Sequence, residues 1–442
     1  MRFIPVSCEQ RDAMLRVVGA EVVDDLFDVI PDEVRLKRPL SLPEGMGEIE
    51  LAAHIEELSA ASSSDLVSFL GAGCYDHYVP AIVDAVVSKP AFFTAYTPYQ
   101  PEVSQGTLQA IYEYQSMICA LTGMDVSNAS MYDGATAFAE AALMAARVTK
   151  RDRVVVSGAV HPEWIEVLRT YAAAGTIEVV ECPAVAGATD LARLAELARD
   201  AAAVLVASPS FWGVLEDLQA LANIAHGAGA LFVVAVNPLL LGVLEPPVTF
   251  GADIVVGEGQ PLGSAMSFGG PGFGVFACKD AFIRQMPGRI VGRTVDVDGR
   301  PGFVLTMQTR EQHIRREKAT SNICSNHSLN ALAAAVYLSA VGQEGLGEIA
   351  RACVMKAHYL HDALIATARF SAVSEAPFAN EFALRYDGDV AAMQTALRSC
   401  GFLAGLDVGR FGDEFAGLVL FAVTEKRTRA QIDRFVEEVG SL

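Results

Sequence analysis

Six short, largely apolar runs between positions 150 and 280 constrain the fold more than any other feature of this sequence. They are Val154–Val156, Ile177–Val180, Val204–Val206, Leu231–Val236, Ile254–Val256 and Val275–Ala277. Segments long enough for crossover helices separate several of them, at Glu163–Ala174, Asp190–Ala201 and Asp217–His226. Strands that are apolar throughout are buried on both faces, as in parallel sheets covered by helices. The pattern predicts a doubly wound α/β domain with right-handed crossovers.

The regions on either side have a different character. Residues 49–58 form an apolar stripe at helical spacing, and a second helix is predicted over Thr107–Leu121, with Gly123 as its stop. A long Ala-rich helix is predicted from Asn326 to about Ala368, followed by short strands and helices of a small α+β domain. We therefore predict a helical arm (1–85), a large α/β domain (86–325) and a small C-terminal domain (326–442).

Charge and cysteine usage exclude several classes of protein. The 442 residues include 33 Lys and Arg against 53 Asp and Glu, a net charge of −20. This acidity argues against binding to nucleic-acid phosphates or to an anionic membrane. The eight cysteines form no CxxC pair and have no His at metal-ligand spacing, so neither a metal site nor a disulfide framework is predicted.

Nothing in the sequence predicts targeting to a membrane or for secretion. Charged residues follow the first Met closely, and the most apolar segment, Leu231–Leu244, is interrupted by Asn237, Pro238 and Gly242. A reducing, cytoplasmic location is the expectation.

Two glycine-rich segments bear on ligand binding. Gly257–Gly263 follows a predicted strand but has GxGxxxG spacing and leads into another strand, so it does not predict a dinucleotide site, and no GKS or GKT sequence predicts a P-loop. In the second segment Gly269, Gly270 and Gly272 either form a turn or allow close approach of the backbone to a ligand or another chain.

Two helix starts are candidate ligand contacts. Gly134, Ala135 and Thr136 follow Asp133 at the start of a predicted helix, whose N–H groups would suit a phosphate or carboxylate, although an ordinary N-cap explains the pattern equally well. His161 lies just past the first apolar run, where α/β proteins bind ligands, but a structural role is the more common one for such a histidine.

Two further segments are candidates for contacts with other molecules. The stiff loop around Tyr96 and Tyr99 contains two prolines, which suits an interface or simply a packed surface loop. The basic cluster with Arg310, His313 and Arg315 is either a solvated helix face or a contact for an anionic group.

Three long segments carry a resemblance to a known family. They read TAYTPYQPEVSQG, ICALTGMDVSNASMYDGATAFAEA and MQTREQHIRREKATSNIC. The chain resembles the glycine decarboxylase P-proteins, and among them the alpha, or N-terminal-half, chains of the two-chain form.

The resemblance implies a pyridoxal-phosphate-dependent transferase fold of type I, with active sites at a dimer interface. It also implies that the complex decarboxylates glycine with pyridoxal phosphate and passes the aminomethyl group to the lipoyl arm of the H-protein. The expected partners are a beta chain, possibly in an α2β2 assembly, the lipoylated H-protein and glycine as substrate.

The residues that such chemistry requires are missing from this chain. The fold needs an Asp at the end of a central strand, where Ala235 stands, and a Lys two loops later, where Gln260 or Pro261 stands. Lys279 and Lys318 are displaced from that position. No catalytic residue is therefore expected here, and the isolated chain is predicted to be inactive.

The rest of the cofactor site resembles a remnant. Its phosphate-holding and ring-stacking parts correspond to Gly134, Ala135, Thr136 and His161. The resemblance thus places pyridoxal phosphate on the partner subunit, and we expect this chain to reach across to that site with Tyr96, Tyr99, Gly269, Gly270 and Gly272. Contacts from Arg310, His313 and Arg315 to the partner or to an anion are the weaker part of this prediction.

Two other interpretations stay open. One is a self-sufficient pyridoxal-phosphate homodimer, similar to desulfurases or decarboxylases, that uses Lys279 or Lys318. The other is a scaffold subunit that only stabilises its partner.

Overall fold

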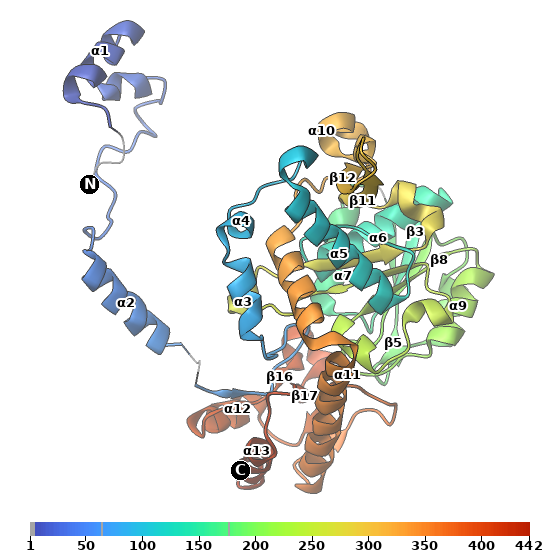
Figure 1. Cartoon of the computed structure of the whole chain (residues 1–442). Helices are drawn as coiled ribbons and strands as arrows, with labels where there is room; N and C mark the ends of the chain where they lie inside the picture. The colour runs from blue at the N-terminus through green and yellow to red at the C-terminus, as the bar shows by residue number, and fades with distance from the viewer. Residues whose placement is uncertain (1–4, 63–64, 176) are drawn as a thin grey trace. The chain divides into compact units, whose positions relative to one another are not determined.

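The structure is a computed structural model that describes residues 5–62, 65–175 and 177–442. Its contacts divide the chain into two units, Met1–Ser64 and Asp65–Leu442 (Figure 1). Among the described residues, none of the helices combines the length and hydrophobicity that a membrane span requires.

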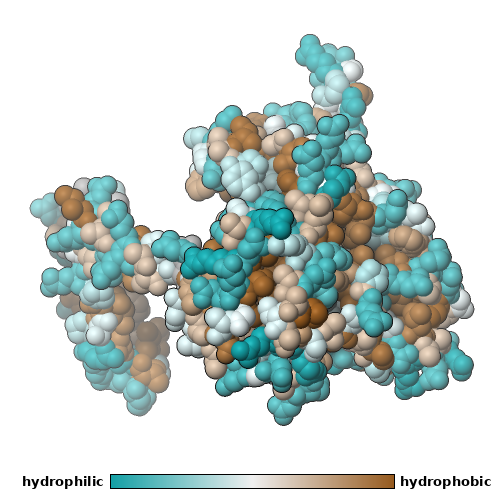
Figure 2. All heavy atoms as spheres, turned by 90° about the horizontal axis from the view of Figure 1, so that it is seen from below, coloured by the Kyte–Doolittle hydropathy of each residue, from teal (hydrophilic) through white to brown (hydrophobic). Residues whose placement is uncertain are grey.

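The first unit carries the helices α1 (Cys8–Val18) and α2 (Glu48–Ala60). The predicted apolar stripe lies on α2, whose described residues are all exposed, with Ile49 and Ile55 among them. Brown, hydrophobic residues lie among teal ones on this unit in Figure 2. The stripe therefore does not build a core within its own unit.

The second unit is organised around a seven-stranded sheet in the order β2-β10-β9-β8-β7-β3-β4. The five neighbouring strands from β9 to β4 pair in parallel, and β10 pairs antiparallel with both β9 and β2. The strands are β2 (Val126–Ser127), β3 (Arg153–Ser157), β4 (Glu178–Cys182), β7 (Ala203–Ala207), β8 (Leu231–Val236), β9 (Ile254–Glu258) and β10 (Gly274–Cys278). Each predicted apolar run overlaps one strand of this sheet.

Helices cover both faces of the sheet, and the apolar residues under them form two separate core clusters. The helices of this region are α3 (Ala81–Val87), α4 (Pro90–Phe93), α5 (Gln105–Thr122), α6 (Gly134–Thr149), α7 (Pro162–Ala172), α8 (Leu191–Leu197) and α9 (Leu218–Gly227). Continuous burial of strands such as β8 is the reason their sequences do not alternate.

The C-terminal region forms a smaller α+β body. The 39-residue helix α11 (Ser328–Ala366) leads into it and is interrupted at Gly342, where φ is 63° and ψ is −176°. Its sheet has the order β13-β14-β17-β16. The elements are β13 (Phe370–Ala372), β14 (Glu381–Tyr386), α12 (Val390–Ser399), β15 (Phe402–Leu403), β16 (Leu406–Asp407), β17 (Leu418–Ala422) and α13 (Arg429–Gly440).

Two features differ from the sequence expectation. Strand β1 (Val67–Ser68) pairs in parallel with β15, and Phe69 packs on Phe435, so this part of the expected arm packs with the C-terminal region. An unpredicted antiparallel hairpin, β11 (Ile290–Val295) and β12 (Pro301–Thr306), follows the large sheet. The remaining short elements are β5 (Ala184–Val185), β6 (Ala188–Thr189) and α10 (Gln312–Arg315).

Candidate active-site pocket

A pocket opens at the carboxyl ends of the parallel strands, the edge at which open α/β sheets bind ligands. It has a cavity of about 80 Å³, with aromatic walls from Trp164 and Phe211 and with Ala235 on its floor strand. A wider hollow of about 430 Å³ adjoins it and shares His161, Trp164 and Glu258. Of the predicted remnant-pocket residues, His161 lines both hollows and Ala135 lines the wider one.

The position expected for a lysine is structural in this chain. Gln260 is buried, and its Oε1 accepts a hydrogen bond from the Tyr75 N–H at 3.0 Å. Its Nε2 donates to the carbonyl oxygens of Tyr75 and Ser264 at 3.0 and 2.8 Å. Pro261 lines the pocket beside it. Among the described residues no lysine lines either hollow.

The start of α6 is capped from within the chain. Asp133 is its N-cap, and the Asp133 carboxylate accepts from the Thr136 N–H at 2.7 Å. The Gly134 N–H donates to Oε2 of Glu258 at 2.9 Å. Burial raises the pKa of Glu258 to about 7, against the effect of the backbone N–H groups that it accepts from. The expected phosphate-holding segment thus already has a carboxyl group as its hydrogen-bond partner.

His161 begins α7 and packs into the pocket wall. Its Nδ1 accepts from the Glu163 N–H at 3.1 Å, and Nε2 lies 3.1 Å from the Ala72 carbonyl oxygen. Acceptance at Nδ1 and donation from Nε2 match a neutral imidazole. Burial lowers the pKa of His161, which also favours the neutral imidazole. Its ring meets Phe211 edge-on, with the centroids 4.8 Å apart.

A second buried carboxyl group borders the pocket. Glu381, on β14, accepts from the Ala72 N–H at 2.6 Å and from the Tyr75 hydroxyl at 2.7 Å. Burial raises its pKa to about 7. These bonds connect the segment after β1 to the C-terminal sheet across 306 residues of sequence.

The two predicted tyrosines have different environments. Tyr96 is 80% exposed, whereas the Tyr99 hydroxyl accepts from Arg289 at 3.1 Å. The Tyr99 ring also lies edge-on to His313, with the centroids 5.8 Å apart. The structure therefore brings Tyr99 together with the predicted basic cluster.

Only part of the basic cluster faces outward. The Arg310 guanidinium donates to the backbone carbonyl oxygens of Met286 and Gly288, and burial lowers its pKa. Arg315 donates to the Thr309 carbonyl oxygen at 3.1 Å, and its residue is exposed, as is His313. Arg310 is thus engaged in holding its own loop.

The glycine segment connects β9 to β10 as an exposed loop. Gly269 and Gly270 have φ values of 104° and 143°, which glycine adopts at little cost. Asn330, in the first turn of α11, donates to the carbonyl oxygens of Pro271 and Gly272 at 2.8 and 3.0 Å. Beside Gly269, Phe268 is 98% exposed with a φ of 54°. Sequence reasoning missed Phe268.

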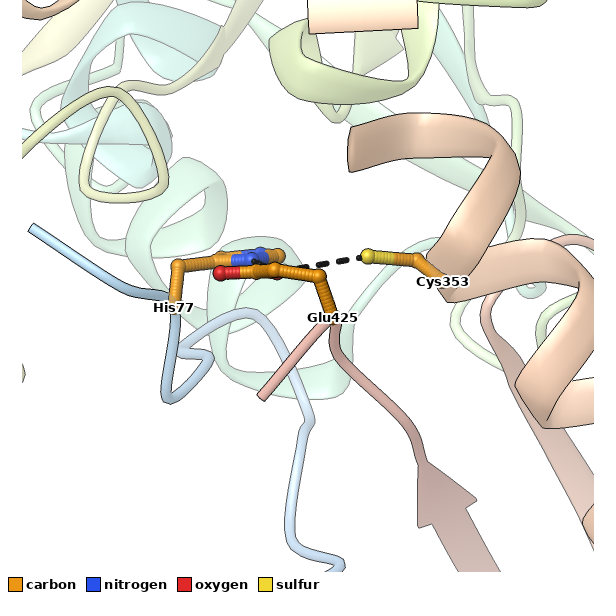
Figure 3. A group of neighbouring side chains, drawn as sticks. All are labelled: His77, Cys353 and Glu425. Atoms are coloured by element: carbon orange, nitrogen blue, oxygen red, sulfur yellow. Dashed lines mark hydrogen bonds and ion pairs between the residues drawn. The ribbon is translucent and has the colours of Figure 1, made fainter. Parts of the chain in front are cut away.

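A separate polar cluster shares no residue with the linings of the two hollows. His77, Cys353 and Glu425 place ligand-type atoms within 4.8 Å of one another (Figure 3). Glu425 Oε2 lies 2.7 Å from His77 Nδ1, and its Oε1 accepts from the Tyr78 N–H at 2.6 Å. Burial alone would raise the pKa of Glu425, but these partners lower it to about 2. Ion pairing and hydrogen bonding account for the arrangement.

Sequence reasoning also missed Trp164, Tyr75, Glu258 and Glu381. Glu258 stands inside the segment Gly257–Gly263, whose glycine spacing does not single it out. A carboxylate directly after an apolar strand was the available signal, because that position faces the ligand edge of a parallel sheet.

Comparison with known proteins agrees with this architecture. The family model described as glycine cleavage system P-protein matches residues 1–439. A probable glycine dehydrogenase (decarboxylating) subunit 1 from Anoxybacillus flavithermus is 51% identical and covers 99% of this chain and 98% of its own. One from Carboxydothermus hydrogenoformans is also 51% identical, covering 100% and 99%.

Solved structures show the same fold. A glycine decarboxylase (P-protein) of the glycine cleavage system, crystallised in inhibitor-bound form, superposes with a TM-score of 0.91 at 47% identity, covering 100% of both chains. A sphingosine-1-phosphate lyase from Burkholderia pseudomallei matches in fold alone, with a TM-score of 0.67 at 16% identity over 93% and 94% of the chains.

These matches confirm the predicted fold class, the type I fold of pyridoxal-phosphate enzymes, and they do not favour a self-sufficient homodimer. With a family model that spans nearly every residue and relatives at half identity over full length, the chain belongs to the glycine cleavage system P-protein family.

Proposed function

We propose that this chain is the non-cofactor subunit of a two-chain glycine decarboxylase. The complex decarboxylates glycine and passes the aminomethyl group to the lipoyl arm of the H-protein. The family and fold imply that the complex depends on pyridoxal phosphate, which supplies the electron sink for decarboxylation when bound. We place that cofactor on a second P-protein chain, since the relatives are named subunit 1.

The observation that carries this proposal is the lysine-free pocket. The residues present do not fit the cofactor: Ala235 has no carboxylate for a pyridine nitrogen, and Gln260 is committed to three hydrogen bonds. Neither displaced lysine helps, because Lys279 is paired with Asp253 and Lys318 is exposed and lines neither hollow. We derive no chemical step within this chain.

Two exposed loops support a role in completing the partner's site. Ala95, beside Tyr96, lines a shallow hollow with Ser328 and Leu329 of α11. The loop of Gly269, Gly270 and Gly272 is tied to the same first turn of α11 through Asn330. Both loops thus flank the start of α11. We propose that the two loops and Tyr99 contact the second chain. His313 and Arg315 extend this surface, where an acidic H-protein or the partner would be bound.

Absorbance and labelling test the proposal. The purified chain is titrated with pyridoxal phosphate, reduced with borohydride and mapped by mass spectrometry, alone and with the second P-protein chain. We expect no modified lysine in this chain, a modified lysine in the partner, and glycine decarboxylation only with both. A stoichiometric modification on Lys279 or Lys318 would contradict the proposal.

The scaffold interpretation makes a different forecast for the same complex. If this chain only stabilises its partner, Tyr96→Phe leaves turnover unchanged. If the loop completes the partner's site, Tyr96→Phe lowers turnover while the complex still forms.

A further inference from the structure

The carboxylate of Glu258 lies where the first turn of α6 would otherwise receive a ligand. Glu258 is the last residue of β9, and α6 begins 124 residues earlier in the sequence. Its Oε2 accepts from the Gly134 N–H at 2.9 Å. Its Oε1 accepts from the N–H groups of Gln260 and Phe273 at 3.0 and 3.2 Å. One internal carboxyl group therefore accepts hydrogen bonds from three backbone N–H groups.

The backbone at Gly134 and Gly272 is closely packed around Glu258. A Cβ on Gly134 would lie 2.4 Å from the Trp164 ring and 2.8 Å from the Glu258 nitrogen. A Cβ on Gly272 would lie 2.4 Å from Glu258 Oε1. The Trp164 indole thus packs against the helix start at Gly134, and the glycine loop passes close to the Glu258 carboxyl group at Gly272.

Charge opposes an anionic ligand as well. Asp133 stands at the same helix start and already accepts the Thr136 N–H. A phosphate monoester carries about −1.5 to −2 charge at pH 7, so it would face the Asp133 carboxylate and, where Glu258 is ionised, a second carboxylate.

We infer that Glu258 excludes the cofactor's phosphate from this chain by occupying the α6 N-terminus with its own carboxylate. Loss of the lysine alone would prevent covalent attachment but leave an anion-binding helix start. Because the Glu258 carboxyl group occupies the α6 N-terminus, this anion-binding position is lost as well. The inference rests on the proposal that the cofactor belongs to the second chain.

Glu258→Ala in the full-length chain tests the inference, with inorganic phosphate and pyridoxal phosphate as probes. Melting temperature and equilibrium dialysis are measured against chloride at equal ionic strength. We expect a saturable rise in the melting temperature of the variant with phosphate, and binding at least about tenfold tighter than by the wild type. Glu258→Gln still fills the space and should gain no phosphate binding.

Glu216→Ala is the matched control. Glu216 is another largely buried carboxyl group that accepts a backbone N–H, from Thr189 at 2.9 Å, but it lines neither hollow. Phosphate binding by a folded Glu258→Ala that is no better than by Glu216→Ala would overturn the inference. So would equally tight phosphate binding by the wild type.

If Glu258→Ala does not fold under standard conditions, its refolding yield is measured with phosphate and with chloride. We expect phosphate, but not chloride, to raise the yield. Absence of rescue counts against the inference. Covalent labelling of a lysine in the wild type would instead refute the proposed function, so the two failures are distinguishable.

Discussion

Asp253 pairs with Lys279 at the ends of β9 and β10 that lie opposite the pocket, with the lysine Nζ 2.6 Å from Oδ1. Asp253 precedes β9 and Lys279 follows the antiparallel β10, and Ile254 is the register partner of Cys278. Glu258 pairs with Gly274 at the other end, four residue steps or roughly 13 Å away. Lys279 therefore stabilises the sheet on the side away from the pocket.

Lys279→Met should lower stability without affecting the cofactor. Asp253 is buried and also accepts from the Phe232 N–H at 2.9 Å, so the variant leaves its charge less compensated. We expect a loss of about 1–3 kcal/mol in urea unfolding. Glycine decarboxylation by the assembled complex should be unchanged below the melting temperature. Loss of a borohydride-trapped adduct on replacing Lys279 would contradict this assignment.

Gln260→Ala should be strongly destabilising. It removes two hydrogen bonds that join the backbone of Tyr75 to the loop after β9 and a third to the Ser264 carbonyl oxygen within that loop, and it leaves buried backbone groups unsatisfied. The expected cost is about 2–4 kcal/mol in denaturant unfolding. Gln219→Ala, which loses only an exposed bond to Asn223, is the control and should cost less than about 0.5 kcal/mol. Equal costs would show that Gln260 is not a structural bridge.

Stability should fall as pH rises through neutrality. The pKa values of Glu258 and Glu381 are raised by burial from 4.5 to about 7. Between these values the native chain retains protons that the unfolded chain has released, so the stabilising contribution is complete below about pH 4.5 and is lost above 7. The difference is on the order of 3 kcal/mol for each group.

Chemical unfolding at pH 5 and pH 8 measures this effect. Glu381→Gln should flatten the pH dependence, because the neutral amide does not titrate. A slope identical to that of the wild type would mean that Glu381 does not carry the effect.

Phe268→Ser should weaken association with the second chain. The ring is almost wholly exposed on the glycine loop and contributes nothing to the core of its own unit. An aromatic anchor at an interface is typically worth about 1–3 kcal/mol, or roughly 5- to 150-fold in Kd. Val185→Ser, on the exposed β5–β6 turn, is the control. Unchanged affinity with unchanged turnover would show that the loop is not part of the interface.

The cluster of His77, Cys353 and Glu425 should be stable without a metal. Lys356 Nζ donates to the Glu425 carbonyl oxygen at 2.6 Å, which adds a positive charge beside the cluster. We therefore expect the melting temperature to be unchanged by a chelator and by added zinc. A zinc-dependent rise that is lost in Cys353→Ser would identify a metal site instead.

Local patterns in the sequence determined the elements of this protein. Val204–Val206 and Leu231–Val236 are apolar on consecutive positions, which is typical of strands buried on both faces, and they lie in β7 and β8. Gly123 ends α5 with a φ of 70°, as its position after the apolar helix predicted. The hairpin of β11 and β12 escaped prediction because β11 has only Ile290 and Val291 before Gly292 and Arg293, which leaves the short apolar run of β12 without a recognisable partner.

The absence of a lysine and an aspartate was also visible in the sequence, at Gln260 and Ala235. Only the tertiary structure decided what takes their place. Glu258 reaches the start of α6 because β9 packs beneath that helix, and Glu381 reaches Tyr75 across 306 residues. Periodicity and turn chemistry are short-range and can be read along the chain, whereas a buried carboxylate is partnered by whichever donors the packing brings to it, and that depends on the whole fold.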